Sequence, residues 1–201
     1  YEVTVYPTRA RLDCTRKVLE DAGRFDLVVC CGGDGTLNEM VSGMMQRQDR
    51  RPMGYIPLGS TNDLAVSLRL PTRVEEAALR AVTGNEFHMD VGTLNDRYFN
   101  YIAAFGAFTE TSYATPQEIK NALGHLAYIL EGVKSLGKIL PIHVKITADD
   151  EQFEEDYLFG AVTNTISLGG VLKLDPEKVL LDDGMYELLL VKNPTNALEA
   201  Q

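Results

Sequence analysis

The sequence has 201 residues, of which 45% are hydrophobic, 24% charged and 8% aromatic. This composition is typical of globular proteins and excludes a disordered, collagen-like or coiled-coil chain. The 19 Lys and Arg residues against 29 Asp and Glu residues give a net charge of −10. We therefore expect no nucleic-acid partner, because phosphate-backbone binding needs clustered positive charge.

The cysteines and the apolar runs indicate the cellular environment of the chain. Cys14, Cys30 and Cys31 form neither a CxxC pair nor a zinc-binding pattern with histidine, which indicates a reducing, cytoplasmic environment. Apolar runs such as residues 27–31 and 188–191 are far shorter than the roughly 18 to 20 residues of a membrane-spanning helix. The sequence therefore predicts no transmembrane segment.

The first half of the chain alternates expected strands with expected helices. Strands are predicted at 3–6, 27–31 and 53–58, and helices at 14–22, 37–45, 63–67 and 74–82. The apolar run at 27–31 is typical of a strand buried on both faces of a parallel sheet. In the first helix, Val18 and Leu19 are expected to point inward. The alternation predicts an α/β fold with a doubly wound parallel sheet.

The pattern changes after Glu86. A hairpin is predicted from strands at 87–94 and 98–105 around the turn residues Asn95 and Asp96. A long helix is predicted at 117–138, and further strands at 143–147, 157–162 and 186–191. Runs of strands with one helix predict an antiparallel, β-rich, sandwich-like domain. We therefore expect two domains, residues 1–84 and 85–201, with the boundary near Gly84.

Two glycine-rich turns, 24 residues apart, share one pattern: Gly35-Thr36-Leu37-Asn38-Glu39 and Gly59-Ser60-Thr61-Asn62-Asp63. Each follows an expected strand and opens an expected helix. Both therefore lie at the carboxyl end of the sheet, where open α/β folds bind ligands. An alternative explanation is a capping box in each copy, in which the Thr36 or Ser60 hydroxyl accepts from the backbone N–H three residues later and the acid at that position reaches back to the first N–H.

Capping does not explain the preceding Gly32-Gly33-Asp34-Gly35. Glycines let the backbone approach a ligand closely, and the free N–H groups of a helix start attract phosphate. Asp34 would repel a bare phosphate, so we expect Mg²⁺ between them. The sequence has neither GxGxxG nor a Gly-Lys-Ser/Thr loop, which disfavours dinucleotide dehydrogenases and P-loop NTPases.

Residues 32–39 (GGDGTLNE) and 57–65 (PLGSTNDLA) together resemble the diacylglycerol kinase catalytic family, and within it the bacterial soluble lipid kinases. The first motif is shared with NAD kinases, whereas the second favours the lipid-kinase branch. The resemblance runs through the whole chain. It implies an ATP-binding α/β domain and a β-rich domain, with the γ-phosphate passing to the hydroxyl of a diacylglycerol-like lipid and giving phosphatidic acid.

The resemblance also implies individual site residues. Ser60 keeps the hydroxyl of the threonine frequent in relatives, and Asp63 matches a carboxylate tied to Asp34 and the Mg²⁺–phosphate network. The full set of implied ATP-binding residues is Thr8, Gly33, Asp34, Gly35, Thr36, Leu37, Asn38, Glu39, Ser60 and Asp63.

A second metal site is implied late in the chain. Residues 180–185 (LLDDGM) resemble the family's structural Mg²⁺ loop, with the Asp183 carboxylate and the carbonyls of Leu180 and Met185 as ligands. From the residues alone, Asp183-Gly184 favours a tight hairpin turn between two strands, and only the resemblance favours the metal loop.

Three features depart from the family pattern. Relatives usually carry glycine where this chain has Leu12, the family's opening strand and Asn-Pro loop do not precede Tyr1, and the Asp-Gly-Glu segment that holds the family's general base does not occur in the sequence. We therefore expect the first strand of the ATP domain to be missing and the base to lie beyond Gln201. The 201-residue chain alone should then bind nucleotide without transferring phosphate, an expectation that ATP-dependent lipid phosphorylation by the purified chain would contradict.

Two other functions stay open. One is an NAD kinase-like enzyme, distinguished by its soluble dinucleotide substrate, and the other is a nucleotide-sensing protein without enzymatic activity. The resemblance further implies a cytoplasmic protein that reaches its lipid at the inner membrane face, and it is compatible with a homodimer.

Overall fold

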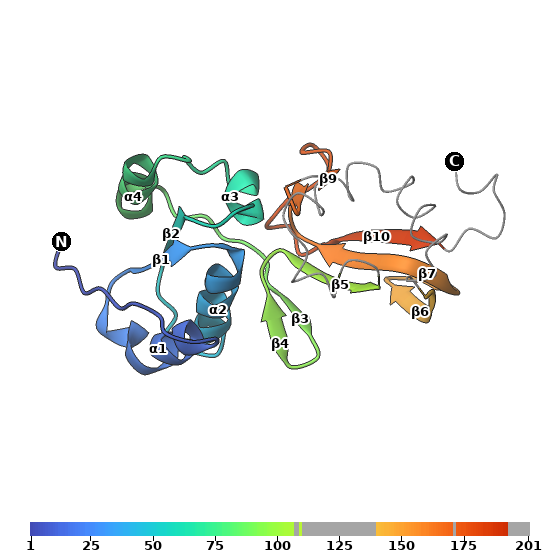
Figure 1. Ribbon diagram of the computed structural model, residues 1–201, viewed down its shortest axis with the longest axis horizontal. Coiled ribbons are helices and arrows are strands. Elements are labelled where there is room, and N and C mark those ends of the chain that lie inside the picture. Colours follow the sequence, from blue (N-terminus) through green and yellow to red (C-terminus); the bar gives the residue numbers. More distant parts are fainter. Residues whose placement is uncertain (107–108, 110–139, 171, 193–201) are drawn as a thin grey trace. The chain divides into compact units, whose positions relative to one another are not determined.

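The computed structural model describes residues 1–106, 109, 140–170 and 172–192 (Figure 1). The chain divides into two compact units, Tyr1–Asn100 and Tyr101–Gln201. The domain boundary near Gly84 stays a prediction. The division into units falls later because a hairpin that follows Gly84 belongs to the first unit.

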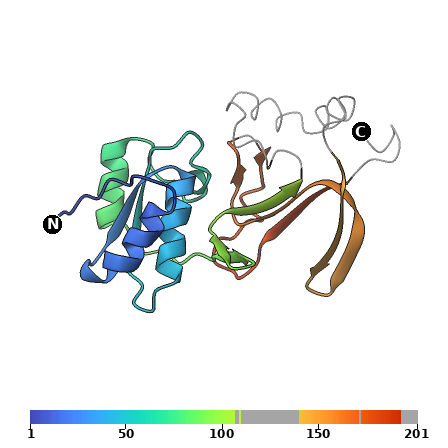
Figure 2. The same ribbon diagram turned by 60° about the horizontal axis from the view of Figure 1, so that its bottom comes forward.

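The first unit has an α/β architecture, as predicted. Its two strands, β1 (Val28–Gly32) and β2 (Met53–Pro57), run parallel with Val28 opposite Met53 and Gly32 opposite Pro57. In both views α1 and α2 lie on one side of this pair and α4 on the other (Figures 1 and 2). The helices are α1 (Asp13–Asp21) with the short 3-10 turn η1 (Ala22–Arg24), α2 (Asp34–Met45), α3 (Asp63–Ser67) and α4 (Val74–Thr83).

The core of this unit lies between α1, α2 and the sheet. Met40 and Met44 of α2 are each 1% exposed, and Val18 of α1 packs in the same cluster. A Cβ atom on Gly43 would lie 2.9 Å from both the Thr15 carbonyl oxygen and the Val18 Cβ. Close packing of α1 on α2 therefore requires a glycine at this position.

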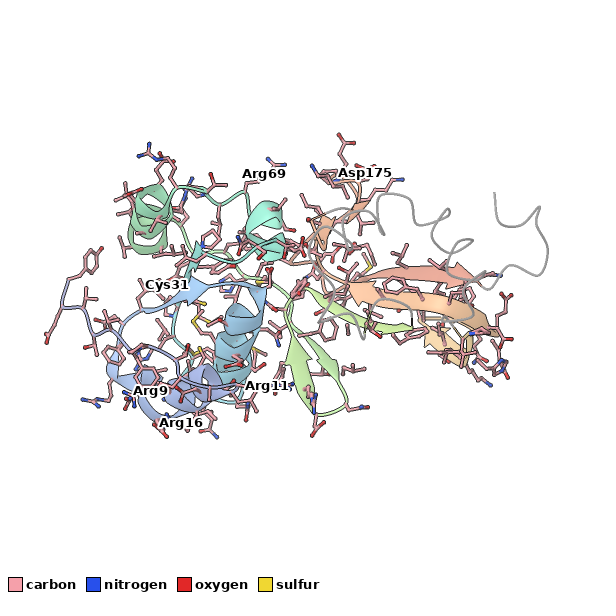
Figure 3. All side chains as sticks on the ribbon, in the orientation of Figure 1. Arg9, Arg11, Arg16, Cys31, Arg69 and Asp175 are labelled. Carbon is pink, nitrogen blue, oxygen red and sulfur yellow. The ribbon has the colours of Figure 1, made fainter. Side chains whose placement is uncertain are left out.

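The expectation that residues 27–31 are buried on both faces is wrong. Cys30 is buried, but Val29 is 37% exposed and Cys31 is also exposed (Figure 3). Ala81 of α4 packs on the face of the sheet to which Val29 points, since a Cβ on the neighbouring Gly54 would meet both side chains. Helix α4 packs mainly on β2, so this face of β1 is only partly covered.

The strand predicted at 3–6 and the inward position of Leu19 are also wrong. Val3 and Val5 are 75% and 81% exposed, and none of the described strands pairs with this segment. Alternation of apolar residues forms a strand only where a neighbouring strand supplies hydrogen bonds. Leu19 is 38% exposed because, one residue after Val18, it lies about 100° further around the helix.

The start of α1 is held by a side chain from α2. Leu12 precedes the helix with a left-handed backbone, φ 65°. Its N–H donates to Glu39 Oε1 at 2.8 Å, the N–H of Cys14 donates to Glu39 Oε2 at 3.3 Å, and the Thr15 hydroxyl donates to the Glu39 carbonyl at 2.8 Å. Glu39 thus takes over the capping that the apolar Leu12 side chain cannot provide.

Next along the chain is the hairpin of β3 (Gly92–Leu94) and β4 (Arg97–Phe99), which turns at Asn95, φ 55°. Both strands are shorter than the predicted 87–94 and 98–105, since the first begins at Gly92 and the second ends at Phe99. The following strand, β5, pairs with β7 in the second unit instead.

The second unit is built on one antiparallel sheet, as predicted. The long strand β7 pairs along its first half with β6 and along its second half with β5 and β10, and it curves visibly in Figure 2. The predicted helix at 117–138 lies outside the described residues. The strands are β5 (Ile102–Gly106), β6 (Ile142–Ala148), β7 (Glu151–Thr163) and β10 (Glu187–Lys192), with a small pair β8 (Ser167–Leu168) and β9 (Leu172–Lys173).

Along the residues that the structure covers, no helix combines the length and the apolar character needed to cross a membrane.

The left-handed Leu12 gives the first prediction. A non-glycine residue in this conformation is strained by about 1 to 2 kcal/mol, part of which is offset because glycine makes the unfolded chain more flexible. We expect Leu12→Gly to raise the free energy of unfolding by up to about 1 kcal/mol in urea melts. Leu79→Gly is the matched control, since Leu12 and Leu79 are 60% and 61% exposed but Leu79 lies inside α4. It should lower stability by about 1 kcal/mol, and equal signs for the two variants would contradict the explanation.

His143 gives the second prediction. On the β6–β7 pair its Nδ1 lies 2.8 Å from Asp156 Oδ1 and its Nε2 lies 3.5 Å from Glu154 Oε1. The two carboxylates, Asp156 first, raise the pKa of His143 above its ordinary value of 6.5. The folded state therefore binds the proton more tightly, so the stabilisation is complete below pH 6.5 and is lost as the pH rises through the folded pKa. Thermal melts should show His143→Gln less stable than wild type in acid and equal to it in mild alkali; an equal difference at both would contradict this assignment.

Candidate functional site

The two glycine-rich turns lie against each other, as parallel pairing of β1 and β2 predicts. The Leu58 N–H donates to the Gly32 carbonyl at 2.8 Å. A Cβ on Gly33 would lie 3.1 Å from the Gly59 Cα, and a Cβ on Gly59 would lie 2.6 Å from the Gly33 Cα. The two backbones are therefore in direct contact at the carboxyl end of the sheet.

The first turn is not a capping box. Helix α2 begins at Asp34 with Gly33 as its N-cap, so Thr36 lies inside the helix, and Glu39 is occupied at the start of α1. The first helical hydrogen bond runs from the Leu37 N–H to the Gly33 carbonyl at 3.0 Å. The N–H groups of residues 34–36 therefore have no acceptor within the helix.

The second turn is not a capping box either. Asn62 precedes α3 with a left-handed backbone, φ 53°, and Ser60 is exposed. The Asn62 Oδ1 accepts from the Gly59 N–H at 2.8 Å and the Tyr55 hydroxyl at 3.2 Å, while its Nδ2 donates to the Gly59 carbonyl at 2.8 Å. Asn62 is thus the residue that builds this turn, and its known tolerance of left-handed backbone was the available signal in the sequence.

Asp34 connects the two turns. It is 9% exposed, and its Oδ2 accepts a hydrogen bond from the Thr61 hydroxyl at 3.0 Å. Its Oδ1 is buried and has no hydrogen-bond partner among the described residues. A buried carboxylate oxygen without a partner is costly, so this atom fits a site for a cation.

Gly35 leaves room beside the helix start. It is exposed, its φ is not positive, and, apart from its chain neighbours and the backbone of its own helix, no described heavy atom lies within 4 Å of the position that a Cβ would take. Neither packing nor backbone conformation therefore explains the glycine. The open space next to the free N–H groups of α2 suits the close approach of an anion such as phosphate.

Three of the candidate ATP-binding residues are engaged within the fold. Leu37 is 4% exposed in the core, and Glu39 holds the start of α1. The Asn38 amide donates to the Tyr98 carbonyl at 3.4 Å and accepts from the Asn100 N–H at 3.2 Å, which fastens α2 to β4. Their contacts with ATP stay predictions.

Two further candidates lie in contrasting surroundings. Thr8 is exposed on the segment before α1, where Arg9 and Arg11 also lie (Figure 3). Asp63, at the start of α3, is 2% exposed. Its predicted link to Asp34 stays a prediction.

The loop at 180–185 is not a tight hairpin, because the residues before it form no strand and β10 pairs with β7. The Met185 N–H donates to Asp183 Oδ1 at 3.0 Å, Gly184 has φ 75°, and the buried Asn164 donates to the Leu181 carbonyl at 3.1 Å. The Glu187 Oε2 is buried without a partner among the described residues. Burial and the nearby Asp183 charge raise the pKa of Glu187.

Oxygen donors of this kind fit Mg²⁺, so the proposed ligand set of Leu180, Asp183 and Met185 stays open. In the part of the chain described, His, Cys, Asp and Glu side chains form no group of three or more that could hold a metal. A site in this loop would therefore depend on backbone carbonyls.

The chain is similar in sequence to diacylglycerol kinases. Residues 1–94 match the family model of the diacylglycerol kinase catalytic domain. The chain is 39% identical over 194 residues to a diacylglycerol kinase of Bacillus subtilis (strain 168), covering 96% of this chain and 64% of that protein. It is 34% identical over 193 residues to one of Staphylococcus saprophyticus, covering 96% and 63%.

The fold agrees with this similarity. A crystal structure of a diacylglycerol kinase from Bacillus anthracis str. Sterne matches with a TM-score of 0.70 and 30% identity, over 92% of this chain and 60% of that one. The chain thus spans less than two thirds of the length of these relatives. The predicted α/β fold and the resemblance stated from the two motifs are confirmed: residues 1–94 match the diacylglycerol kinase catalytic domain, and 96% of the chain is similar to diacylglycerol kinases.

Proposed function

We propose that this chain holds the ATP-binding part of a lipid kinase, which transfers the γ-phosphate of ATP to the hydroxyl of a diacylglycerol-like lipid and gives phosphatidic acid. The observation that carries the proposal is the contact of the two turns. It places the free N–H groups of α2, the open side of Gly35 and the Asp34 carboxylate at one end of the sheet. The names of the relatives support diacylglycerol as the acceptor.

The phosphates of ATP would be held by the start of α2. Residues 34–36 present N–H groups without a helical acceptor, and the helix dipole adds positive potential at the same place. Gly35 lets a phosphate oxygen come near because no side chain occupies that side. Positioning and charge stabilisation of this kind are the main protein contributions to phosphoryl transfer.

Asp34 is the residue that would hold Mg²⁺, through its buried Oδ1, and the buried Asp63 at the start of α3 belongs to the same proposal. When bound, Mg²⁺ supplies positive charge that offsets the charge of the β- and γ-phosphates. A structural Mg²⁺ would be held by Asp183 and the carbonyls of Leu180 and Met185. The contacts of ATP with Thr8, Thr36, Ser60 and the other residues of the implied set belong to the same proposal.

The lipid determines where such a protein works. Diacylglycerol stays in the bilayer, so the proposal includes a cytoplasmic protein with peripheral access to the inner membrane face. A homodimer is compatible with it.

The proposal is tested by binding and by transfer. Fluorescent ATP should bind the purified chain more tightly with Mg²⁺ than without it, and Asp34→Ala should remove this difference. In a protein that also carries the general base expected beyond Gln201, Asp34→Ala should slow phosphate transfer to diacylglycerol by about 100-fold or more, the scale of losing one electrostatic group. Transfer to NAD instead of diacylglycerol, or no nucleotide binding at all, would contradict the proposal.

Gly35→Ala separates ligand approach from folding. Its Cβ meets no described atom within 4 Å, and alanine favours a helix by about 1 kcal/mol over glycine, so the thermal midpoint should stay equal or rise. ATP affinity should fall by about tenfold or more, because the Cβ occupies the space expected for phosphate.

Gly59→Ala is the contrasting variant, since its Cβ would lie 2.6 Å from the Gly33 Cα. It should lower both the thermal midpoint and ATP affinity. A Gly35→Ala protein that binds ATP like wild type would move the phosphate away from α2.

A further inference from the structure

Thr61 is in contact with the residue expected to hold the cation, although it comes from the other turn. In the shared pattern of the two turns it occupies the same place as Leu37. Leu37 is 4% exposed in the core, whereas the Thr61 hydroxyl donates to Asp34 Oδ2 at 3.0 Å. The same position of the pattern thus serves packing in one turn and a polar contact in the other.

The second turn holds Thr61 in a fixed place. On one side of Thr61, Gly59 is pressed against the Gly33 backbone. On the other side, Asn62 bonds to both the N–H and the carbonyl of Gly59 and to the Tyr55 hydroxyl. The Thr61 hydroxyl is therefore presented to Asp34 by a closed, hydrogen-bonded turn.

The bond to Thr61 decides how Asp34 uses its two oxygens. A carboxylate in the first turn of a helix is attracted to that helix's own free N–H groups. With Oδ2 bound to Thr61, the side chain is held across to the second turn, and Oδ1 stays buried without a partner among the described residues. The N–H groups of α2 are thereby left for another anion, and one carboxylate oxygen is left for a cation.

We propose that Thr61 is a positioning residue, which holds the Asp34 carboxylate so that Oδ1 is directed to Mg²⁺ and the N–H groups of α2 stay free for phosphate. This inference rests on the proposed function. Thr61 itself need not touch ATP, so its effect should appear in the coupling between Mg²⁺ and ATP rather than in folding.

The test compares Thr61→Val, which removes the donor at similar size, with Thr61→Ser, which keeps it. Affinity for fluorescent ATP is measured with and without Mg²⁺, and the ratio is the coupling. We expect Thr61→Val to lower this ratio by about tenfold, the order of a hydrogen bond to a charged group, and Thr61→Ser to keep it within about twofold of wild type. Thr72→Val, at an exposed position of the same unit, should leave the ratio unchanged.

A double-mutant cycle with Asp34→Ala separates positioning from a general structural role. Thr61→Val should lower the affinity for ATP in the presence of Mg²⁺ in wild type and leave it unchanged in the Asp34→Ala background, because the carboxylate it positions is then absent, whereas a general structural role would lower it in both. If Thr61→Val folds poorly, Thr61→Ala takes its place in the same cycle. The inference would be overturned if Thr61→Val and Thr61→Ala kept the wild-type ratio, including the case in which each lowers ATP affinity equally with and without Mg²⁺. A wild-type ratio of one would instead contradict the proposed function.

Discussion

The backbone contact between Gly33 and Gly59 is the constraint on which the first unit depends. A Cβ on Gly59 would lie 2.6 Å from the Gly33 Cα, and one on Gly33 would lie 3.1 Å from the Gly59 Cα. Because β1 and β2 are parallel neighbours that end together, this contact makes α2 and α3 begin at one place. A larger residue would separate the turns and break the reach of Thr61 to Asp34, so a requirement of backbone packing also sets the geometry of the candidate site.

Polar residues that match a functional motif serve the fold here as well. Asn38 and Glu39 follow the glycines in the family pattern, yet their side chains fasten α2 to β4 and to the start of α1. Glu39 also holds the N–H of the left-handed Leu12. The strain of a non-glycine residue at that position is therefore tolerated because two hydrogen bonds at the helix start oppose it.

The sequence predicted those features that depend on local order, such as α3 at Asp63–Ser67 and the turn at Asn95. Prediction from the sequence failed where a structural feature depends on a contact with residues far away in the chain. Alternation at 3–6 cannot tell whether a neighbouring strand is present, and the spacing of Thr36 and Glu39 cannot tell that the helix already begins at Asp34. Thr61 was overlooked as a site residue for the same reason, since its contact with Asp34 exists only once the two turns meet.

A carboxylate at the start of α2 presents a physical conflict for any phosphate-binding role. The free N–H groups attract anions in general, so Asp34 and a phosphate compete for the same positive end of the helix. Glycines alone do not decide this competition, because they open space for either anion. A donor outside the helix can decide it by giving the carboxylate another partner, and the Thr61 hydroxyl is placed to do so. Phosphate binding at this site would thus depend on the second turn even where that turn makes no contact with the phosphate.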